Sequence, residues 1–159
     1  MVKVGILTIS DLGSVGKRAD TAGERLIERI REKGWAVERY EIVPDEKQII
    51  SARLKEWSDD VGLNLILTNG GTGFSDRDVT PEATIEVLDK SAPGIPEAMR
   101  AAGLLKTPMA ILSRAVAGIR KSTLIINLPG SERGAIESLE AVLEALPHAL
   151  DVIMGKPGH

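Results

Sequence analysis

Glycine, aspartate and threonine residues gather in one segment of the chain, TNGGTGFSDRDVTPEAT, at residues 68–84. Gly70, Gly71 and Gly73 can adopt positive φ angles and bring backbone N–H groups to a ligand without a Cβ in the way. Successive N–H groups form a concavity that binds anions, and Thr72 adds a hydroxyl. These residues fit either a phosphate-binding loop or a tight turn at the end of a strand.

Asp78 lies two residues before Thr80, where a helix is expected to begin. Its carboxylate could cap that helix, but Thr80 already supplies a cap. A carboxylate beside bound phosphate repels the anion unless a cation lies between them, and Mg²⁺ bridges carboxylates and phosphates. We therefore expect Asp78 to hold Mg²⁺. Asp76 and Arg77 are weaker candidates: the aspartate can be merely solvated, and the arginine can neutralise phosphate or pair with an aspartate.

Asp45, in the segment PDEKQ, has two interpretations. As the N-cap of a helix, with Gln48 three residues later, it would form a capping box. As a second Mg²⁺ carboxylate, it would need its loop to face the glycine loop. The local chemistry favours capping.

The loop after the first expected strand, SDLGSVGKRAD, contains further candidates. Ser10, Asp11 and Gly13 can line a pocket, whereas Lys17 and Arg18 can be solvated loop charges. The segment is not a P-loop, because its glycines are separated by two residues instead of four and no Lys-Ser or Lys-Thr pair follows.

Basic and hydroxyl residues in the segment LSRAVAGIRKST could collect a second phosphate. They are Ser113, Arg114, Arg120, Lys121 and Ser122. A turn exposed to water explains Arg120 and Lys121 equally well. Further on, Gly130 and Ser131 precede a helix N-terminus, which suits an anion or ordinary capping by the serine.

The elements that position these residues follow from hydrophobic periodicity. Apolar and β-branched runs predict strands at residues 2–9, 35–43, 63–68, 109–112 and 123–128. Amphipathic runs predict helices at residues 20–33, 44–57, from 80 onward, 96–105 and 129–146. Alternating strands and helices indicate an α/β sandwich with a largely parallel sheet. Ligands bind outside the carboxyl ends of such strands, where most of the candidate loops gather.

Length and composition exclude several classes of protein. The 159 residues predict a single domain over 1–159, and the net charge of −3 argues against nucleic-acid binding. The chain has no cysteine, and His148 and His159 are its only histidines, so thiolate metal sites and a Ser/His/Asp triad have little to build with. No apolar run approaches the ~20 residues that span a bilayer, so we expect a cytoplasmic protein without membrane contact.

Six segments between Val4 and Leu146 carry a family resemblance: TISD, DTAG, VPDE, LTNGGTGFSDRDVTPEAT, APGIPEAMR and AILSRAVAGIRKSTLIINLPGS. The sequence resembles the molybdenum-cofactor biosynthesis family of the Mog/MoaB type, which includes the G domains of plant and animal molybdenum-insertion proteins. The resemblance implies a three-layer α/β/α sandwich that assembles as a homo-oligomer, a trimer. It also implies that Mg-ATP adenylylates the terminal phosphate of molybdopterin, giving adenylyl-molybdopterin and pyrophosphate, with the molybdenum-insertion protein as a further partner.

The resemblance assigns roles to particular residues. Asp45 and Asp78 match the family's two functional aspartates, which places Asp45 above its local interpretation as a cap. The remaining implied ligand-binding residues lie in the glycine loop, on its rim and in motifs around the same cleft; they are Ser10, Asp11, Gly70, Gly71, Thr72, Gly73, Ser113, Arg114, Pro129, Gly130 and Ser131. Asn69 departs from the pattern, which has a small hydroxyl residue there, although an amide can still form a hydrogen bond with a ligand.

Two other functions use the same loops. The chain could bind molybdopterin or scaffold its partners without chemistry, or it could be an enzyme acting on another phosphate-sugar or nucleotide. The presence of both Asp45 and Asp78 favours the enzyme over the carrier, because a simple anion binder gains nothing from two carboxylates.

Overall fold

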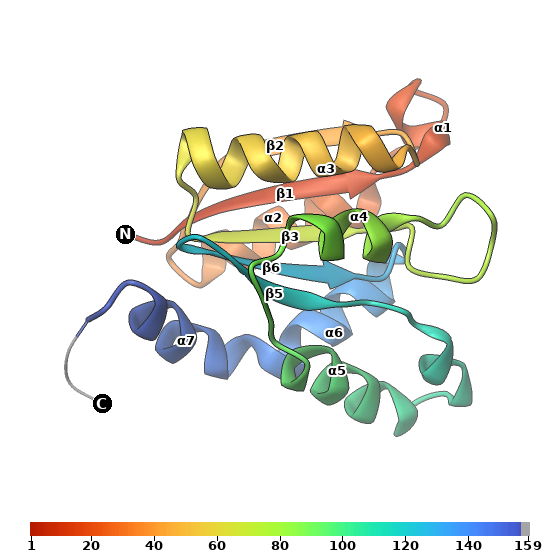
Figure 1. The fold of residues 1–159 in the computed structure, drawn as a ribbon. Coiled ribbons are helices and arrows are strands. Elements are labelled where there is room, and N and C mark those ends of the chain that lie inside the picture. The colour runs from red at the N-terminus through yellow and green to blue at the C-terminus, as the bar shows by residue number, and fades with distance from the viewer. Residues whose placement is uncertain (157–159) are drawn as a thin grey trace.

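The computed structural model describes residues 1–156, and it contains a six-stranded sheet with helices on both faces (Figure 1). The strand order is β2-β1-β3-β6-β5-β4, and the first four of these strands run parallel. β5 and β4 complete the sheet in antiparallel pairing. The strands are β1 (Lys3–Ile9), β2 (Ala36–Val43), β3 (Leu65–Asn69), β4 (Lys90–Ser91), β5 (Ala117–Arg120) and β6 (Thr123–Leu128).

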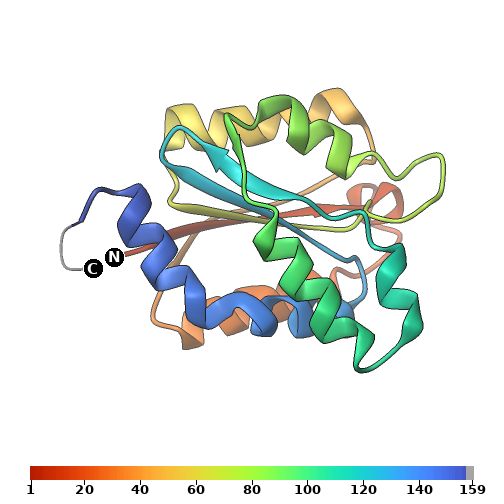
Figure 2. The ribbon, with the colours of Figure 1, turned by 60° about the horizontal axis from the view of Figure 1, so that its bottom comes forward.

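The helices form the two outer layers. Figure 2 shows α3 and α4 on one face of the sheet and α2, α5, α6 and α7 on the other. The α-helices are α1 (Asp11–Ser14), α2 (Thr21–Glu32), α3 (Lys47–Glu56), α4 (Thr80–Val87), α5 (Gly94–Leu104), α6 (Glu132–Val142) and α7 (Leu146–Ile153). A π-helical turn, η1 (Trp57–Val61), and two 3₁₀ turns, η2 (Pro108–Leu112) and η3 (Leu143–Ala145), complete the set. The expected three-layer sandwich is confirmed.

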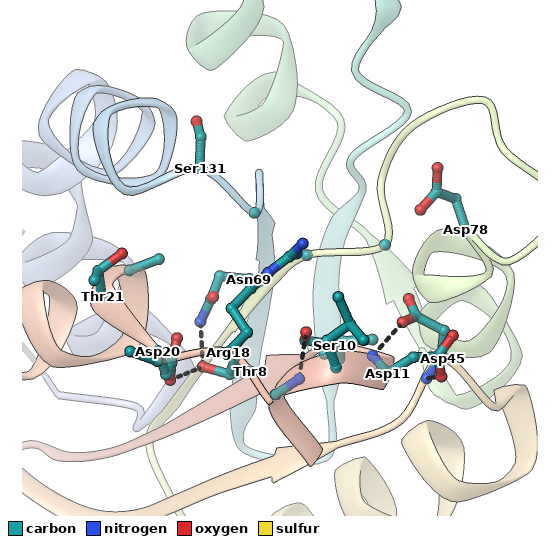
Figure 3. Close-up of a pocket in the computed structure, with 18 residues that line it drawn as sticks. Thr8, Ser10, Asp11, Arg18, Asp20, Thr21, Asp45, Asn69, Asp78 and Ser131 are labelled. Carbon is teal, nitrogen blue, oxygen red and sulfur yellow. Dashed lines mark hydrogen bonds between the residues drawn. The ribbon is translucent and has the colours of Figure 1, made fainter. Parts of the chain in front are cut away.

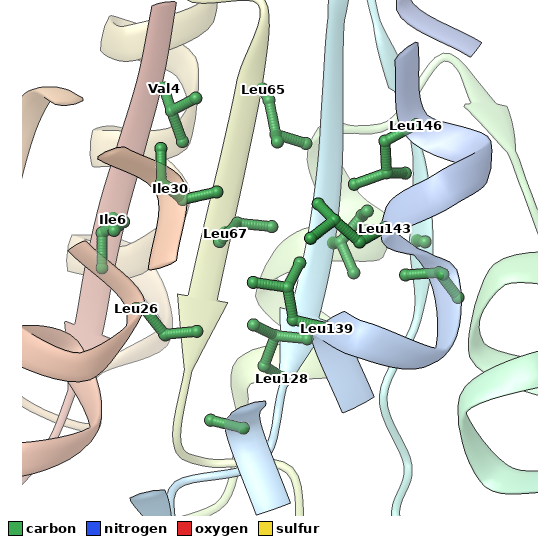
Figure 4. Packing of buried hydrophobic residues seen from close by; sticks show 14 of the residues in the cluster. Val4, Ile6, Leu26, Ile30, Leu65, Leu67, Leu128, Leu139, Leu143 and Leu146 are labelled. Carbon is green, nitrogen blue, oxygen red and sulfur yellow. The ribbon is translucent and has the colours of Figure 1, made fainter. Parts of the chain in front are cut away.

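Two apolar cores lie on opposite faces of the sheet. Along β3, Leu65 and Leu67 face the core beneath α2, α6 and α7, whereas Ile66 faces the core beneath α3 and α4. Figure 4 shows the first core, where Leu139 and Leu143 pack toward the strands. A central strand buried on both faces needs apolar residues throughout, which is why its sequence shows no polar alternation.

Most expected elements are confirmed, with bounds shifted by a few residues. The Asp20 side chain caps α2 as predicted, accepting a hydrogen bond of 2.9 Å from the Gly23 amide. Gly34 follows the helix at a φ of +85°, which suits its role as a stop. The final helix is divided by η3, because Pro147 at the start of α7 has no N–H to continue the α6 ladder.

The strand predicted at residues 109–112 is wrong. Thr107 caps a 3₁₀ turn there by accepting from the Met109 amide, and Pro108 begins the turn. Met109 and Ile111 are 63% and 62% exposed, so these apolar side chains lie on the surface and not in a buried strand. The strand that does form in this part of the chain, β5, begins at Ala117, and β4 lies outside it at the edge of the sheet.

None of the helices within residues 1–156 is long and apolar enough to cross a membrane. Residues 157–159, which include His159 and the end of the domain predicted over 1–159, lie outside the part of the chain that the structure describes.

Candidate functional site

A pocket of about 450 Å³ opens at the carboxyl ends of the parallel strands (Figure 3). The strand register aligns these ends, because Thr8 of β1 pairs with Asn69 of β3, which pairs with Leu128 of β6. The loops that follow the three strands therefore start at one level and meet. Nine residues predicted for the site line this pocket: Ser10, Asp11, Gly13, Asp45, Gly70, Gly71, Asp78, Gly130 and Ser131.

The glycine loop, residues 70–73, follows β3 and requires glycine at its start. Gly70 and Gly71 have φ angles of +102° and +70°, which residues with a Cβ rarely adopt. A Cβ on Gly70 would lie 2.2 Å from the Ile9 carbonyl oxygen, and one on Gly71 would lie 2.3 Å from Thr80 Oγ1. The loop thus passes too close to its neighbours for any side chain at these two positions.

Thr80 anchors this loop, which corrects its predicted role as a helix cap. α4 begins at Thr80, preceded by Val79 at an N-cap position without a side-chain hydrogen bond. The Thr80 hydroxyl instead donates to the Gly70 carbonyl at 2.9 Å, and its amide donates to the Gly71 carbonyl at 3.1 Å. The buried threonine fixes the loop to the start of α4.

Asp45 is not a helix cap either, so the capping-box interpretation is wrong. α3 begins at Lys47, and Glu46 at its N-cap position makes no side-chain capping bond. Asp45 Oδ2 instead accepts from the Asp11 amide at 2.9 Å, and the Asp45 amide donates to Asp11 Oδ1 at 2.9 Å. This reciprocal pair ties the loop after β2 to the loop after β1.

The carboxylates of Asp45 and Asp78 both adjoin the glycine loop. Asp45 Oδ1 lies 3.2 Å from the position a Cβ would take on Gly71, and Asp78 Oδ2 lies 2.8 Å from that position on Gly73. Ser75 holds Asp78 in place by donating its amide and its hydroxyl to Oδ2, at 3.0 and 2.8 Å. Figure 3 shows the two carboxylates at one end of the pocket, on separate loops.

The charge at this end of the pocket is unbalanced. Burial raises the pKa of Asp45, and the nearby carboxylates of Asp11 and Asp78 raise it further. Arg77 pairs with Asp11 and Glu46 at 2.9 and 3.0 Å, and its hydrogen bond to Asp11 lowers the pKa of that carboxyl. Arg77 is therefore the partner of an aspartate, one of its two predicted alternatives.

The donor set fits a Mg²⁺ ion only if a ligand completes it. Among residues 1–156, no group of three or more acidic or histidine side chains is placed to hold a metal ion by itself. Mg²⁺ is usually held by one or two carboxylates, substrate phosphates and water, however. Four aspartates and one arginine, Arg18, line the pocket within the described chain. Bound phosphate would meet this excess of negative charge, and a divalent cation would compensate it.

A second cavity of about 340 Å³ adjoins the first and is lined by all the other residues that the resemblance implies except Arg114. Thr72, Gly73, Ser113, Pro129 and Ser131 line it, and Ser131 borders both cavities. The Ser131 hydroxyl accepts from the Gly134 amide at 3.0 Å, so it caps α6, as one of its two interpretations predicted.

Arg114 supports the glycine loop. Its Nε donates to the Gly73 carbonyl and its Nη2 to the Asp78 carbonyl, both at 2.7 Å. Glu82 holds the same guanidinium by an ion pair of 2.6 Å. All three guanidinium nitrogens of Arg114 therefore donate to protein oxygens, so this residue positions the loop.

Arg120 and Lys121 lie at the opposite end of the sheet, at the turn between β5 and β6. Arg120 Nη2 pairs with Asp59 Oδ2 at 2.7 Å and Nη1 donates to the Val87 carbonyl, while Lys121 pairs with Asp59 at 3.4 Å. The strand direction thus separates these residues, and Ser122 beside them, from the pocket. Of the two interpretations, collection of a phosphate near Ser113 is wrong, and a turn at Lys121 and Ser122 is what the structure shows.

Sequence reasoning missed five polar residues of the pocket as site residues: Thr8, Arg18, Asp20, Thr21 and Asn69. Thr8 and Asn69 had a detectable signal, because each is a polar residue near the carboxyl end of a buried apolar strand. Asp20 was recognised only as a cap, but its carboxylate also accepts from the hydroxyls of Thr8 and Tyr40, at 2.6 and 2.5 Å. Burial and the bond to Asp20 raise the pKa of Tyr40, so this phenol stays protonated and donates.

Known proteins with similar sequences share this architecture. Residues 5–148 match a family model described as "Probable molybdopterin binding domain". The molybdopterin adenylyltransferase of Helicobacter pylori strain J99 is 43% identical over 156 residues, which cover 97% of this chain and 89% of that protein. The molybdopterin adenylyltransferase of Escherichia coli K12 is 42% identical over 146 residues, 91% of this chain and 75% of that protein.

A solved structure extends the similarity to three dimensions. The crystal structure of the molybdopterin biosynthesis enzyme MoaB from Thermus thermophilus aligns with a TM-score of 0.93 and 57% identity, and the alignment covers 99% of each chain. A match of this length and identity, together with the family model, leaves the assignment clear: this chain belongs to the molybdopterin-binding domain family of molybdenum cofactor biosynthesis.

Proposed function

We propose that this chain is a molybdopterin adenylyltransferase, which transfers the adenylyl group of ATP to the terminal phosphate of molybdopterin. Relatives with 39–43% identity over most of the chain carry that name. The observation that carries the proposal is the convergence of Asp45 and Asp78, from separate loops, on the glycine loop.

The reaction needs no nucleophile from the protein. A terminal phosphate oxygen of molybdopterin attacks the α-phosphorus of ATP, a new P–O–P bond forms, and the bond to the β-phosphate breaks to release pyrophosphate. Catalysis then consists of positioning and charge neutralisation. The amides of the glycine loop bind phosphate oxygens, and Asp45 and Asp78 are the residues that would hold Mg²⁺. A bound Mg²⁺ offsets the negative charge that grows on the leaving pyrophosphate.

The two cavities suit two substrates. We assign the nucleotide to the larger one, where the acidic residues and the glycine loop lie, and the pterin to the smaller one. Ser131 borders both, so the molybdopterin phosphate and the α-phosphate of ATP would meet near the start of α6. The positive end of that helix favours phosphate at this point.

The expected trimer is also part of the proposal. Leu105, Met109 and Ile111 form an exposed apolar surface on the end of α5 and on η2, with Leu105 89% exposed. Such a surface suits contact with a copy of the chain. Leu105→Glu should therefore shift the sedimentation coefficient of the assembly to that of a monomer. Transfer of the product to a molybdenum-insertion protein stays a prediction from the family resemblance.

The direct test is incubation with molybdopterin and Mg-ATP, followed by measurement of pyrophosphate release. We expect release by the wild-type chain and its loss in Asp78→Ala, with folding and pterin binding largely intact. Asp76→Ala is the matched control, because this exposed aspartate lies in the same loop and should turn over within about twofold of wild type.

Three results would contradict the proposal. Wild-type turnover by Asp78→Ala would remove the metal role of that residue. Binding of molybdopterin without pyrophosphate release by the wild-type chain would assign a carrier function instead. Competition for the cleft by an unrelated phosphate-sugar, and none by molybdopterin, would change the substrate.

A further inference from the structure

Asn69 is buried at the end of β3, where it lines the nucleotide side of the site with 1% of its surface exposed. Its side-chain nitrogen donates to Thr8 Oγ1 at 2.9 Å. The oxygen and nitrogen of an amide look alike in shape, so their assignment has to come from the hydrogen-bond network.

The network fixes which way the amide faces. The Thr8 hydroxyl has one proton, which it donates to Asp20 Oδ2 at 2.6 Å. Asp20 itself is held by the Gly23 amide and the Tyr40 hydroxyl, which are both donors. Thr8 can therefore only accept from Asn69, so the NH₂ group must face Thr8 (Figure 3). The carboxamide oxygen is turned the other way.

Asn127, near the end of the adjacent strand β6, makes a useful comparison. Its nitrogen donates to the hydroxyls of Thr68 and Thr84, both at 3.0 Å, and its oxygen accepts from the Val116 amide at 3.2 Å. For Asn69, by contrast, none of the hydrogen bonds within residues 1–156 ends on Oδ1, and this oxygen is not among the fully buried atoms without a partner, so it opens to the pocket that the side chain lines. The amide is held in one orientation at the wall of the pocket, so Oδ1 is placed to accept a hydrogen bond from a donor of a bound ligand.

We propose that Asn69 Oδ1 accepts a hydrogen bond from a ribose hydroxyl of the bound nucleotide and makes the site selective for ribonucleotides. This inference rests on the proposed binding of ATP. Phosphate oxygens are acceptors and cannot serve as partners for Oδ1. Gly70 follows Asn69 and begins the loop assigned to the phosphates, so the sugar attached to the α-phosphate is the nearest part of ATP that carries donors.

The test compares four nucleotides with the wild-type chain and Asn69→Thr, by titration calorimetry without molybdopterin. The nucleotides are ATP, 2′-deoxy-ATP, 3′-deoxy-ATP and purine riboside triphosphate, which lacks the amine of adenine. We expect wild type to bind ATP roughly tenfold more tightly than one of the two deoxy analogues, which is the usual worth of one hydrogen bond. In Asn69→Thr this ratio should fall to about one, because the carboxamide oxygen is gone.

Thr8 acts through Asn69 as a positioning residue, so its variants sharpen the test. Thr8→Val removes the hydroxyl that orients the amide, so it should lower the ratio of the affinities for ATP and the deoxy analogue severalfold. Thr8→Ser keeps the hydroxyl and should keep the wild-type ratio. Asn127→Thr is the matched control, because it removes a buried amide on the neighbouring strand. It should lower the thermal midpoint of unfolding and leave the ratio unchanged.

The outcomes separate this inference from the proposed function. Equal ratios in wild type and Asn69→Thr overturn the inference even when molybdopterin-dependent pyrophosphate release is intact. Discrimination only against purine riboside triphosphate also overturns it, since the donor would then be the base. If the wild-type chain discriminates between ATP and a deoxy analogue but releases no pyrophosphate with molybdopterin, the proposed function is contradicted and this inference is not.

Discussion

The two ends of the sheet contain the same kinds of residue, but their charges are balanced in different ways. At the amino end, Asp59 is paired with Arg120 and Lys121, and the hydrogen bond from Arg120 lowers the pKa of this carboxyl. At the carboxyl end, burial and two neighbouring carboxylates raise the pKa of Asp45. Asp59 is thus neutralised by protein groups, whereas no ion pair within residues 1–156 neutralises Asp45.

The glycines at the two ends differ in a parallel way. Gly62 and Gly71 have nearly identical φ angles, +72° and +70°. A Cβ on Gly62 would meet no atom within 4 Å, whereas a Cβ on Gly71 would collide with Thr80. The first glycine serves only to end a helical turn, and the second also makes room for the loop at the pocket. The comparison shows that residue type alone does not mark a site; unmet charge and close packing do.

The largest expected effect follows from removing charge at each end. Asp78→Asn keeps the shape of the side chain and should lower the rate of pyrophosphate release by about 10³-fold, the usual scale for loss of a group that stabilises transition-state charge. Asp59→Asn should change the rate by less than about twofold, because Asp59 lies far from the pocket. Steady-state kinetics at saturating Mg-ATP measures both. A similar loss of pyrophosphate release in Asp78→Asn and Asp59→Asn would show that the two ends of the sheet do not differ in this respect.

A smaller effect is expected for the two glycines. Gly71→Ala should lower activity by about 10- to 100-fold, because the clash with Thr80 displaces the amides that bind phosphate. Gly62→Ala should cost about 1 kcal/mol of unfolding free energy through its positive φ and leave activity unchanged. Urea unfolding and the pyrophosphate assay separate the two quantities. An active Gly71→Ala enzyme would show that the tight loop is not needed for phosphate binding.

Arg120→Gln should lower the thermal midpoint by a few degrees at pH 7. The pKa of Asp59 is lowered from 3.8 in the folded state, so the unfolded chain binds the proton more readily. The stabilisation is therefore complete above about pH 5, and it disappears as the pH falls through the lowered pKa. Melting curves from pH 7 to pH 3 should show the two proteins converging. A constant difference across this range would assign the effect to packing alone.

The smallest effect has the opposite sign. Asp45→Asn should raise the thermal midpoint by about 1–2 °C at pH 7, because it removes a charge that is penalised in the fold. The folded pKa of Asp45 is raised, so its cost is present above that pKa and disappears as the carboxyl protonates at lower pH. The same variant should lose most adenylyl transfer. A lower midpoint at pH 7 would mean that Asp45 is needed for stability.

Strong local patterns predicted most of the fold. The apolar runs of β1, β3 and β6 are buried as expected, and so are Ile50 and Leu54 on α3 and Trp57 at the start of η1. The strand predicted at residues 109–112 was wrong because an exposed apolar segment has the same composition as a buried strand. β5 was missed because its four residues, 117–120, lie among charged and glycine residues that resemble a turn.

The candidate site was only partly predictable, for reasons of geometry. Arg120 is six residues from Arg114, yet β5 carries the chain about 13 Å along the sheet to the other end. Asp45 has the sequence of a cap, but its carboxylate accepts from Asp11, which is 34 residues away. The orientation of Asn69 depends on Thr8 and Asp20, which also lie on other loops and strands.

By itself, the sequence determined most of the strands and helices, because burial repeats with the period of each element. It also determined where the glycine loop lies and, through family resemblance, which reaction to expect. Only the tertiary structure decided which acidic residues stay without a cationic partner and which amide is held in one orientation at the wall of the pocket. These properties depend on contacts between loops that follow different strands, and no local pattern records them.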